Sequence, residues 1–129
     1  MMFNDLRFIR FWFVLGWVFV VAAMVLSLMP LQQVTMPSWN DKIEHAMGYF
    51  LLTLWFCGLY RRQRYWVVAL WMLAMGVLVE ILQGMMHLGR QAEIMDIYAD
   101  ILGIGIAIFL AITPLGRWPY WFEKLVPKS

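Results

Sequence analysis

Polar and ionisable residues in this chain fall at matching ends of long apolar runs. Runs without a charged residue alternate with short polar stretches, and the polar side chains lie within one or two helical turns of the run ends: Asp41, His45, Glu80, Gln83, Asp96 and Asp100. If the runs cross a membrane as helices, these side chains gather near one face of it. Ionisable groups are costly there, so a cluster of them indicates a functional site.

The composition excludes an ordinary soluble domain. Of the 129 residues, 64% are hydrophobic and only 14% are charged, whereas a soluble domain of this size needs more charge to cover its surface. The ten basic residues are scattered between the apolar runs, so the sequence has no patch for nucleic acid. The single cysteine, Cys57, cannot form an internal disulfide, and we expect it to pack as a small apolar residue.

The run lengths predict a single all-α domain over residues 1–129, a four-helix transmembrane bundle. The first run has 19 residues, close to the roughly 20 that cross the hydrocarbon, and it is too long for a signal-peptide core. The other three have 15 residues each, which cover only about 22 Å. They cross a core roughly 30 Å thick only with their polar turns included. The predicted spans are therefore about 11–29, 41–60, 65–86 and 96–115, followed by an interfacial tail at 116–129.

The basic residues predict the orientation of these spans. With both termini inside, eight of the ten lie on the cytoplasmic side, and only Lys42 and Arg90 lie outside. Cytoplasmic loops carry an excess of Lys and Arg, so we expect an N-in/C-in topology. The polar cluster then faces the exterior, which is the periplasm if the cell is Gram-negative.

Helical spacing aligns the polar residues of each span on one face. Each stripe continues into small residues, which let membrane helices approach closely. We therefore expect the polar faces to point at one another inside the bundle. The three stripes are Asp41, His45, Gly48, Tyr49 and Leu52; Gly76, Glu80, Gln83 and Gly84; and Asp96, Asp100, Gly103 and Ala107.

Two blocks of these residues resemble the VanZ-like family of small multi-pass membrane proteins. The first is Asp-Lys-Ile-Glu-His-Ala-Met-Gly-Tyr at 41–49, and the second runs from Glu80 and Gln83 through Gly89-Arg90 to Asp96 and Asp100. Together they cover roughly residues 37–110. The chain departs from the family pattern at Asp100, where Asn is more usual, and Glu44 is a local addition.

The resemblance implies a four-helix protein of the bacterial cytoplasmic (inner) membrane. Its prototype links the family to resistance against glycopeptide antibiotics. The resemblance supplies a set of positions and no established reaction, so the chemistry has to be argued from the residues.

Two sets of candidate site residues follow. For acid–base work we expect Asp41, His45, Glu80 and Asp96, and for substrate binding Lys42, Tyr49, Gln83, Arg90 and Asp100. Each has a plainer explanation as well. Asp41 and Asp96 suit helix N-caps, and His45 could be a hydrogen-bonded packing residue.

Several functions stay open at this point. An enzyme acting on an envelope lipid or lipid-linked glycan would use His45 as acid or base, oriented by Asp41. A non-enzymatic protein would bind such a precursor, a lipid headgroup or the antibiotic. An ion-coupled transporter is disfavoured by the uniformly apolar cytoplasmic halves, and a purely structural cluster would contribute little stability. A divalent metal could be held by Asp41, His45, Glu80 and Asp96, although no compact ligand motif is present.

Overall fold

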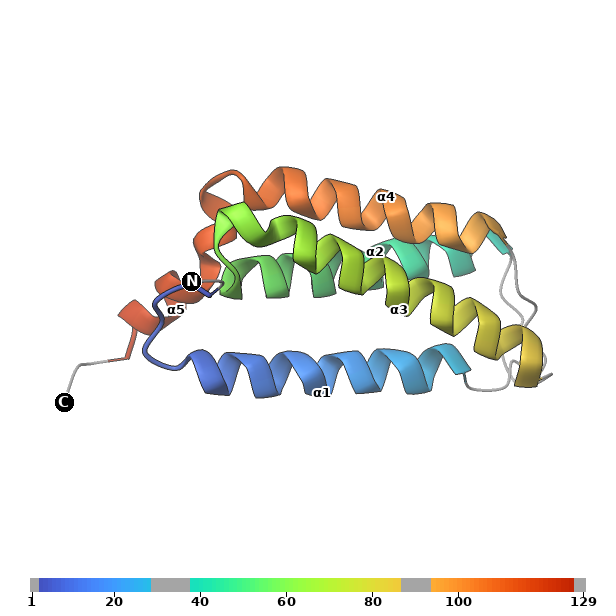
Figure 1. Cartoon of the computed structure of the whole chain (residues 1–129), viewed down its shortest axis with the longest axis horizontal. Coiled ribbons are helices and arrows are strands. Elements are labelled where there is room, and N and C mark those ends of the chain that lie inside the picture. The colour runs from blue at the N-terminus through green and yellow to red at the C-terminus, as the bar shows by residue number, and fades with distance from the viewer. Residues whose placement is uncertain (1–2, 29–37, 87–93, 127–129) are drawn as a thin grey trace.

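The computed structural model describes residues 3–28, 38–86 and 94–126. Within these ranges the chain forms five α-helices and two short 3₁₀ helices, which confirms the all-α expectation. They are α1 (Ile9–Leu28), α2 (Ser38–Leu59), η1 (Arg62–Arg64), α3 (Tyr65–Met86), α4 (Ile94–Ala111), η2 (Pro114–Arg117) and α5 (Trp118–Lys124), drawn in Figure 1.

Among the described residues, two helices are long and apolar enough to cross a membrane by themselves, over Ile9–Ser27 and Arg62–Leu82. A third span arises if Ile97–Ala111 and Pro114–Lys124, bent by 84° at their junction, are taken as one, and Ile43–Leu59 is a shorter apolar helix. The apolar side chains of α1 are largely exposed, for example Val14 at 64% and Val21 at 58%. Such helices indicate a membrane protein.

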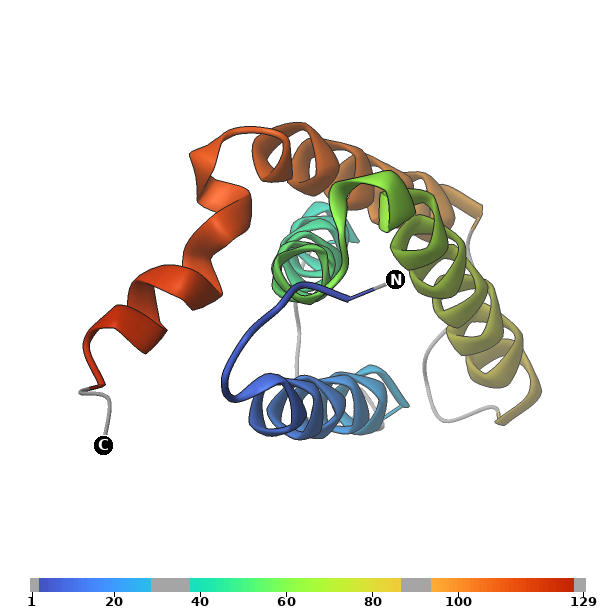
Figure 2. The same ribbon diagram turned by 60° about the vertical axis from the view of Figure 1, so that its left-hand side comes forward.

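Helix α2 lies at the centre and packs against α1, α3 and α4 (Figure 2). Its contact with α4 is the most extensive in the described chain. A Cβ at Gly103 would lie only 2.2 Å from the Ala46 carbonyl oxygen, so the absence of a side chain there sets how closely the two helices approach. The predicted core position of Cys57 is confirmed, since its exposed fraction is 0%.

Helix α4 ends at Ala111, four residues before the span end expected at 115. Pro114 has no N–H to donate and disfavours a helical residue before it. Thr113 is extended and its hydroxyl oxygen accepts a hydrogen bond from the Leu115 N–H. Gly116 then allows the chain to fold back against α4, because a Cβ there would lie 2.0 Å from the Ala111 carbonyl oxygen.

The tail expected to be interfacial contains the short helix α5. Hydrogen bonds to Glu123 connect this helix to the start of α1. The carboxylate of Glu123 accepts hydrogen bonds from the backbone N–H of Arg7 at 2.9 Å, the N–H of Phe8 at 3.0 Å and the indole of Trp12 at 2.8 Å. The Arg7 guanidinium also donates to the Glu123 carbonyl oxygen at 2.7 Å. A carboxylate at a helix N-terminus accepts hydrogen bonds from N–H groups that have no partner within the helix. Its negative charge also interacts favourably with the helix dipole.

These contacts also change the acidity of Glu123. Burial alone raises the pKa of its carboxyl, but the hydrogen bonds from Phe8, Trp12 and Arg7, with the Arg7 charge, outweigh burial. Its pKa therefore lies below the ordinary value, and the carboxylate is the stable form in the folded protein.

Three tryptophans reinforce this junction. The Trp55 indole donates to the Trp12 carbonyl oxygen at 3.1 Å, and the Trp118 indole donates to the Leu54 carbonyl oxygen at 3.0 Å. The ring centroids of Trp55 and Trp118 are 4.4 Å apart. A polar indole N–H with an apolar body suits a membrane–water boundary.

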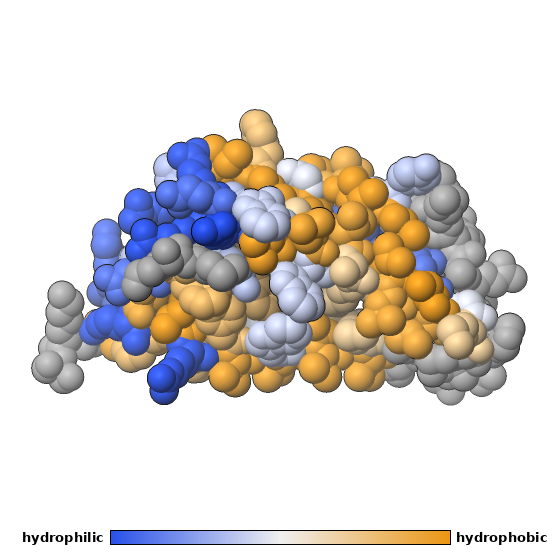
Figure 3. All heavy atoms as spheres, in the orientation of Figure 1, coloured by the Kyte–Doolittle hydropathy of each residue, from blue (hydrophilic) through white to orange (hydrophobic). Residues whose placement is uncertain are grey.

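Hydrophilic surface collects at the same end of the molecule, where α1 and α3 begin and α2 ends (Figure 3). Seven described basic residues belong to the segments of this end: Arg7, Arg10, Arg61, Arg62, Arg64, Arg117 and Lys124. We call it the basic end. The visible face between the two ends is dominated by hydrophobic residues.

Candidate functional site

A histidine–aspartate pair is buried between α2 and α4. His45 Nδ1 lies 3.1 Å from Asp100 Oδ1, and the exposed fractions of the two residues are 8% and 0%. An ionised carboxylate only accepts hydrogen bonds. With Asp100 ionised, the contact therefore places a proton on Nδ1 and leaves Nε2 as the nitrogen that can take up or release a second one.

Two further polar side chains are buried with this pair. Tyr49 follows His45 by one helical turn on α2, and Glu80 comes from α3; each has an exposed fraction of 5%. The rings of His45 and Tyr49 are stacked, with centroids 6.5 Å apart and planes 15° apart. Tyr49 is also close enough to Asp100 and Glu80 to interact electrostatically with both. We call His45, Tyr49, Glu80 and Asp100 the buried polar cluster.

Glycines make the cluster possible by letting three helices approach. A Cβ at Gly76 of α3 would lie 2.7 Å from Asp100 Oδ2, so a side chain at this position would displace the carboxylate. Gly76 precedes Glu80 by four residues, and Gly103 follows Asp100 by three, so each glycine shares a face with a cluster carboxyl group. The small residues that follow the polar stripes thus bring the polar faces together, as the sequence indicated.

The cluster lies in the half of the bundle away from the basic end. His45 is near the start of α2, Glu80 near the end of α3 and Asp100 near the start of α4, and these three helix ends lie at the same end of the molecule, opposite the N-terminus, in Figure 1. From the start of α4 at Ile94 to Asp100 the axial distance is about 9 Å. The cluster therefore lies below the helix ends by more than one turn.

The remaining predicted site residues lie outside the part whose side chains are described. Asp41 and Lys42 are on α2, Gln83 is on α3 and Asp96 is on α4, so their backbones line the same end as the cluster. Arg90 lies in 87–93, outside the described residues. The sequence paired His45 with Asp41, one turn away, whereas the bond that the structure shows is to Asp100 on another helix.

Metal binding finds no support in the described side chains. Among them, no three His, Cys, Asp or Glu side chains gather closely enough to hold a metal ion. Two of the four metal ligands considered from the sequence, Asp41 and Asp96, are not among these side chains.

The sequence analysis did not identify two of the buried polar residues in the described part of the chain. Thr53 is fully buried one turn beyond Tyr49, in line with the α2 stripe that begins at Asp41, and the spacing of four residues could have identified it. Glu123 is also buried, with an exposed fraction of 7%. Its partners are more than 110 residues away along the chain, so no local pattern points to them.

No family model, no curated protein and no solved structure matches this chain.

Proposed function

We propose that this chain is a VanZ-like multi-pass protein of a bacterial inner membrane, and that its buried polar cluster forms the wall of a pocket for a lipid headgroup or a lipid-linked glycan. The observation that carries the proposal is the His45–Asp100 pair, buried between α2 and α4. Lipids and lipid-linked glycans present phosphates and hydroxyl groups at the membrane surface, so such a headgroup would reach the cluster by entering between the helix ends.

A structural role explains the cluster poorly. Buried polar pairs in membrane proteins stabilise by only about 0.6 kcal/mol on average, whereas ionisable groups inside a membrane are expensive to place there. The helices already have close packing through Gly103 and a large apolar core. Selection for a function accounts for the cost better than selection for stability.

The proposed pocket requires four spanning helices with both termini inside. Helices α2 and α3 have 22 residues each and α4 has 18, lengths of about 33 Å and 27 Å that suit a hydrocarbon core roughly 30 Å thick. The basic end lies on the cytoplasmic side by the excess of Lys and Arg. The buried polar cluster then belongs to the outer leaflet.

Reporter fusions test this topology. Green fluorescent protein joined after Ser129 is expected to fluoresce, since it folds in the cytoplasm, and alkaline phosphatase inserted at Gly89 is expected to be active, since it requires the periplasm. An active phosphatase after Ser129 would place the C-terminus outside and overturn the orientation.

Acid–base chemistry is the second candidate, favoured by the geometry of the pair. Asp100 holds the imidazole in one orientation, and Nε2 would act as the general base or acid toward a bound substrate. Glu80 would supply the second carboxyl group. Lys42 and Arg90 are the residues that we expect to hold a phosphate.

Native mass spectrometry of the protein purified from its membrane tests the pocket. The wild type is expected to retain a lipid or lipid-linked glycan that the His45→Ala/Glu80→Gln double variant has lost. Glu44→Gln is the matched control, because Glu44 precedes His45 but is exposed. Equal retention by folded double variant and wild type would overturn the proposal, and conversion of the ligand only by the wild type would favour the enzyme.

A further inference from the structure

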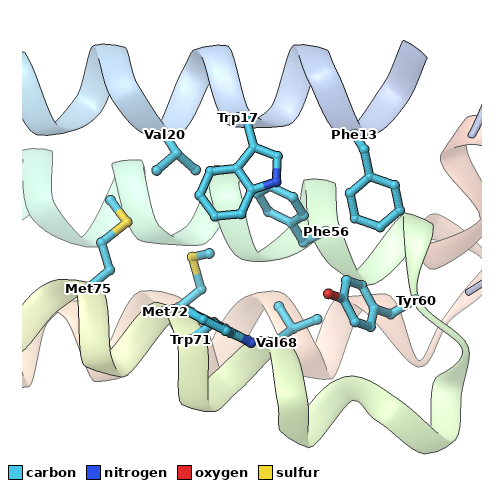
Figure 4. Close-up of a pocket in the computed structure, with 9 residues that line it drawn as sticks. All are labelled: Phe13, Trp17, Val20, Phe56, Tyr60, Val68, Trp71, Met72 and Met75. Carbon is cyan, nitrogen blue, oxygen red and sulfur yellow. The ribbon is translucent and has the colours of Figure 1, made fainter. Parts of the chain in front are cut away.

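An apolar groove lies between α1 and α3, with α2 beneath it (Figure 4). Its volume is about 150 Å³. Val20, Phe56 and Val68 are buried in it, whereas the Trp17 and Trp71 side chains at its margin are 53% and 62% exposed. The groove is therefore open on the side away from α2, toward the surroundings of the bundle.

Each wall of the groove begins with an arginine at the basic end. On α1, Arg10 precedes Phe13, Trp17 and Val20 by three, seven and ten residues. On the other wall, Arg64 precedes Val68, Trp71 and Met75 by four, seven and eleven. In α1 these spacings place Arg10 on the same helical face as the lining residues that follow it, and Arg64, the last residue of η1, lies directly before α3.

Both arginine side chains are exposed, and neither guanidinium makes a hydrogen bond or an ion pair with a described residue. This distinguishes them from neighbouring arginines. Arg61 donates to the Phe3 carbonyl oxygen at 3.1 Å, and Arg62 donates to the Ile112 carbonyl oxygen at 3.0 Å. The two guanidinium groups at the basic ends of these two helices thus remain available to an anion.

The groove also has the length of one leaflet. Helices α1 and α3 both begin at the basic end and run in the same direction (Figure 1). From Arg10 to Val20 the axial distance is about 15 Å, which is half of a hydrocarbon core roughly 30 Å thick. A chain lying along the groove from the arginines would end near the middle of the membrane.

We propose that this groove binds one acyl chain of an anionic phospholipid from the leaflet at the basic end, and that Arg10 and Arg64 hold its phosphate. Guanidinium groups form forked hydrogen bonds with phosphate oxygens. The cytoplasmic leaflet is rich in anionic lipids, which bind basic pockets between transmembrane helices. The site rests on the topology proposed above, which puts it in the opposite leaflet from the buried polar cluster, and it does not depend on the proposed headgroup pocket.

The test is lipid retention by the full-length protein in detergent, measured by native mass spectrometry. Dioleoyl phosphatidylglycerol and dioleoyl phosphatidylcholine are added in equal amounts, since they share acyl chains and differ in net charge. The wild type is expected to retain one lipid molecule, and to retain phosphatidylglycerol about tenfold more often than phosphatidylcholine. The Arg10→Gln/Arg64→Gln variant is expected to lose this preference.

Matched variants separate the groove from general charge and surface effects. Arg117→Gln/Lys124→Gln removes two exposed positive charges from the same end and is expected to keep the preference. Met75→Trp fills the groove and is expected to reduce retention of both lipids, whereas Leu70→Trp changes an α3 residue that is 57% exposed and does not line the groove, and should leave retention unchanged.

Three outcomes would overturn the proposal. The first is an unchanged preference in folded Arg10→Gln/Arg64→Gln protein, and the second is an equal loss in the Arg117→Gln/Lys124→Gln control. The third is a lipid-free dimer that Met75→Trp dissociates, which would assign the groove to a second copy of this chain.

Discussion

Two regions of this protein contain buried carboxyl groups, and the hydrogen-bond partners of these groups differ between the two regions. At the basic end, the Glu123 carboxylate accepts three hydrogen bonds from donors that stay protonated at any ordinary pH: the N–H groups of Arg7 and Phe8 and the Trp12 indole. In the buried polar cluster, Asp100 meets His45, which itself gains and loses protons.

The difference separates a structural role from a functional one. Fixed donors favour the carboxylate form of Glu123 and connect α5 to α1, so its contribution is to stability. The pair of Asp100 and His45 can exist with different numbers of protons, and such pairs suit acid–base work or recognition of a charged headgroup. Burial alone does not distinguish the two cases, but the identity of the partners does.

The largest effect is expected from Glu123→Ala. The change leaves the Arg7 and Phe8 N–H groups and the Trp12 indole without their acceptor, and we expect it to lower the free energy of unfolding by about 3 kcal/mol. Thermal unfolding in detergent, followed by circular dichroism, measures this. Glu44→Ala is the control, with an effect below about 0.5 kcal/mol. Equal effects of both changes would contradict the structural role of Glu123.

The approach of α4 to α2 gives the next largest effect. Gly103→Ala places a Cβ against the Ala46 carbonyl oxygen and is expected to destabilise the protein by about 2 kcal/mol, and to weaken ligand retention because it moves Asp100 away from His45. Gly105→Ala is the matched control, because a Cβ there meets nothing within 4 Å. A Gly103→Ala variant with the melting temperature of the wild type would show that α2 and α4 are not closely packed at Gly103.

The lowered pKa of Glu123 predicts a pH dependence for the basic end. A carboxyl group whose pKa is lower in the folded state contributes stability above its unfolded pKa, which is near 4.5, and this contribution is lost as the pH falls through the folded value. We therefore expect the melting temperature to fall below about pH 4.5. In Glu123→Gln the fall should be smaller. Identical acid profiles for the two proteins would exclude Glu123 as the titrating group.

The smallest effect on stability is expected in the buried polar cluster. Asp100→Asn preserves the shape of the side chain and an oxygen that accepts from His45, so we expect less than about 1 kcal/mol of destabilisation. The same melting experiment measures it. A loss of stability as large as that of Glu123→Ala would show that Asp100 has a structural role and would remove the main argument for a functional pocket.

The sequence predicted one of these regions far better than the other. Spacing along single helices was enough to place His45, Glu80 and Asp100 on stripes with Gly76 and Gly103, because a helix fixes which residues share a face. The pairing of His45 with Asp100 depends on the register between two helices, and a carboxyl one turn away at Asp41 was the nearer choice.

The basic end was predicted only in part. The short turn between the spans at 41–60 and 65–86 was predicted, whereas the fourth span was carried past the break at Pro114. The hydrogen bonds to Glu123 join segments near the two ends of the chain. Their donors are backbone N–H groups, which every residue but proline has. Sequence patterns therefore cannot identify which N–H groups a distant carboxylate will meet.

The most direct test of the central claim compares Asp100→Asn with Glu123→Gln in both melting and native mass spectrometry. We predict that Asp100→Asn melts within a few degrees of the wild type but loses the co-purified lipid or lipid-linked glycan, whereas Glu123→Gln melts lower and keeps it. Full ligand retention by a folded Asp100→Asn protein would contradict the account, since the buried polar cluster would then have no part in binding.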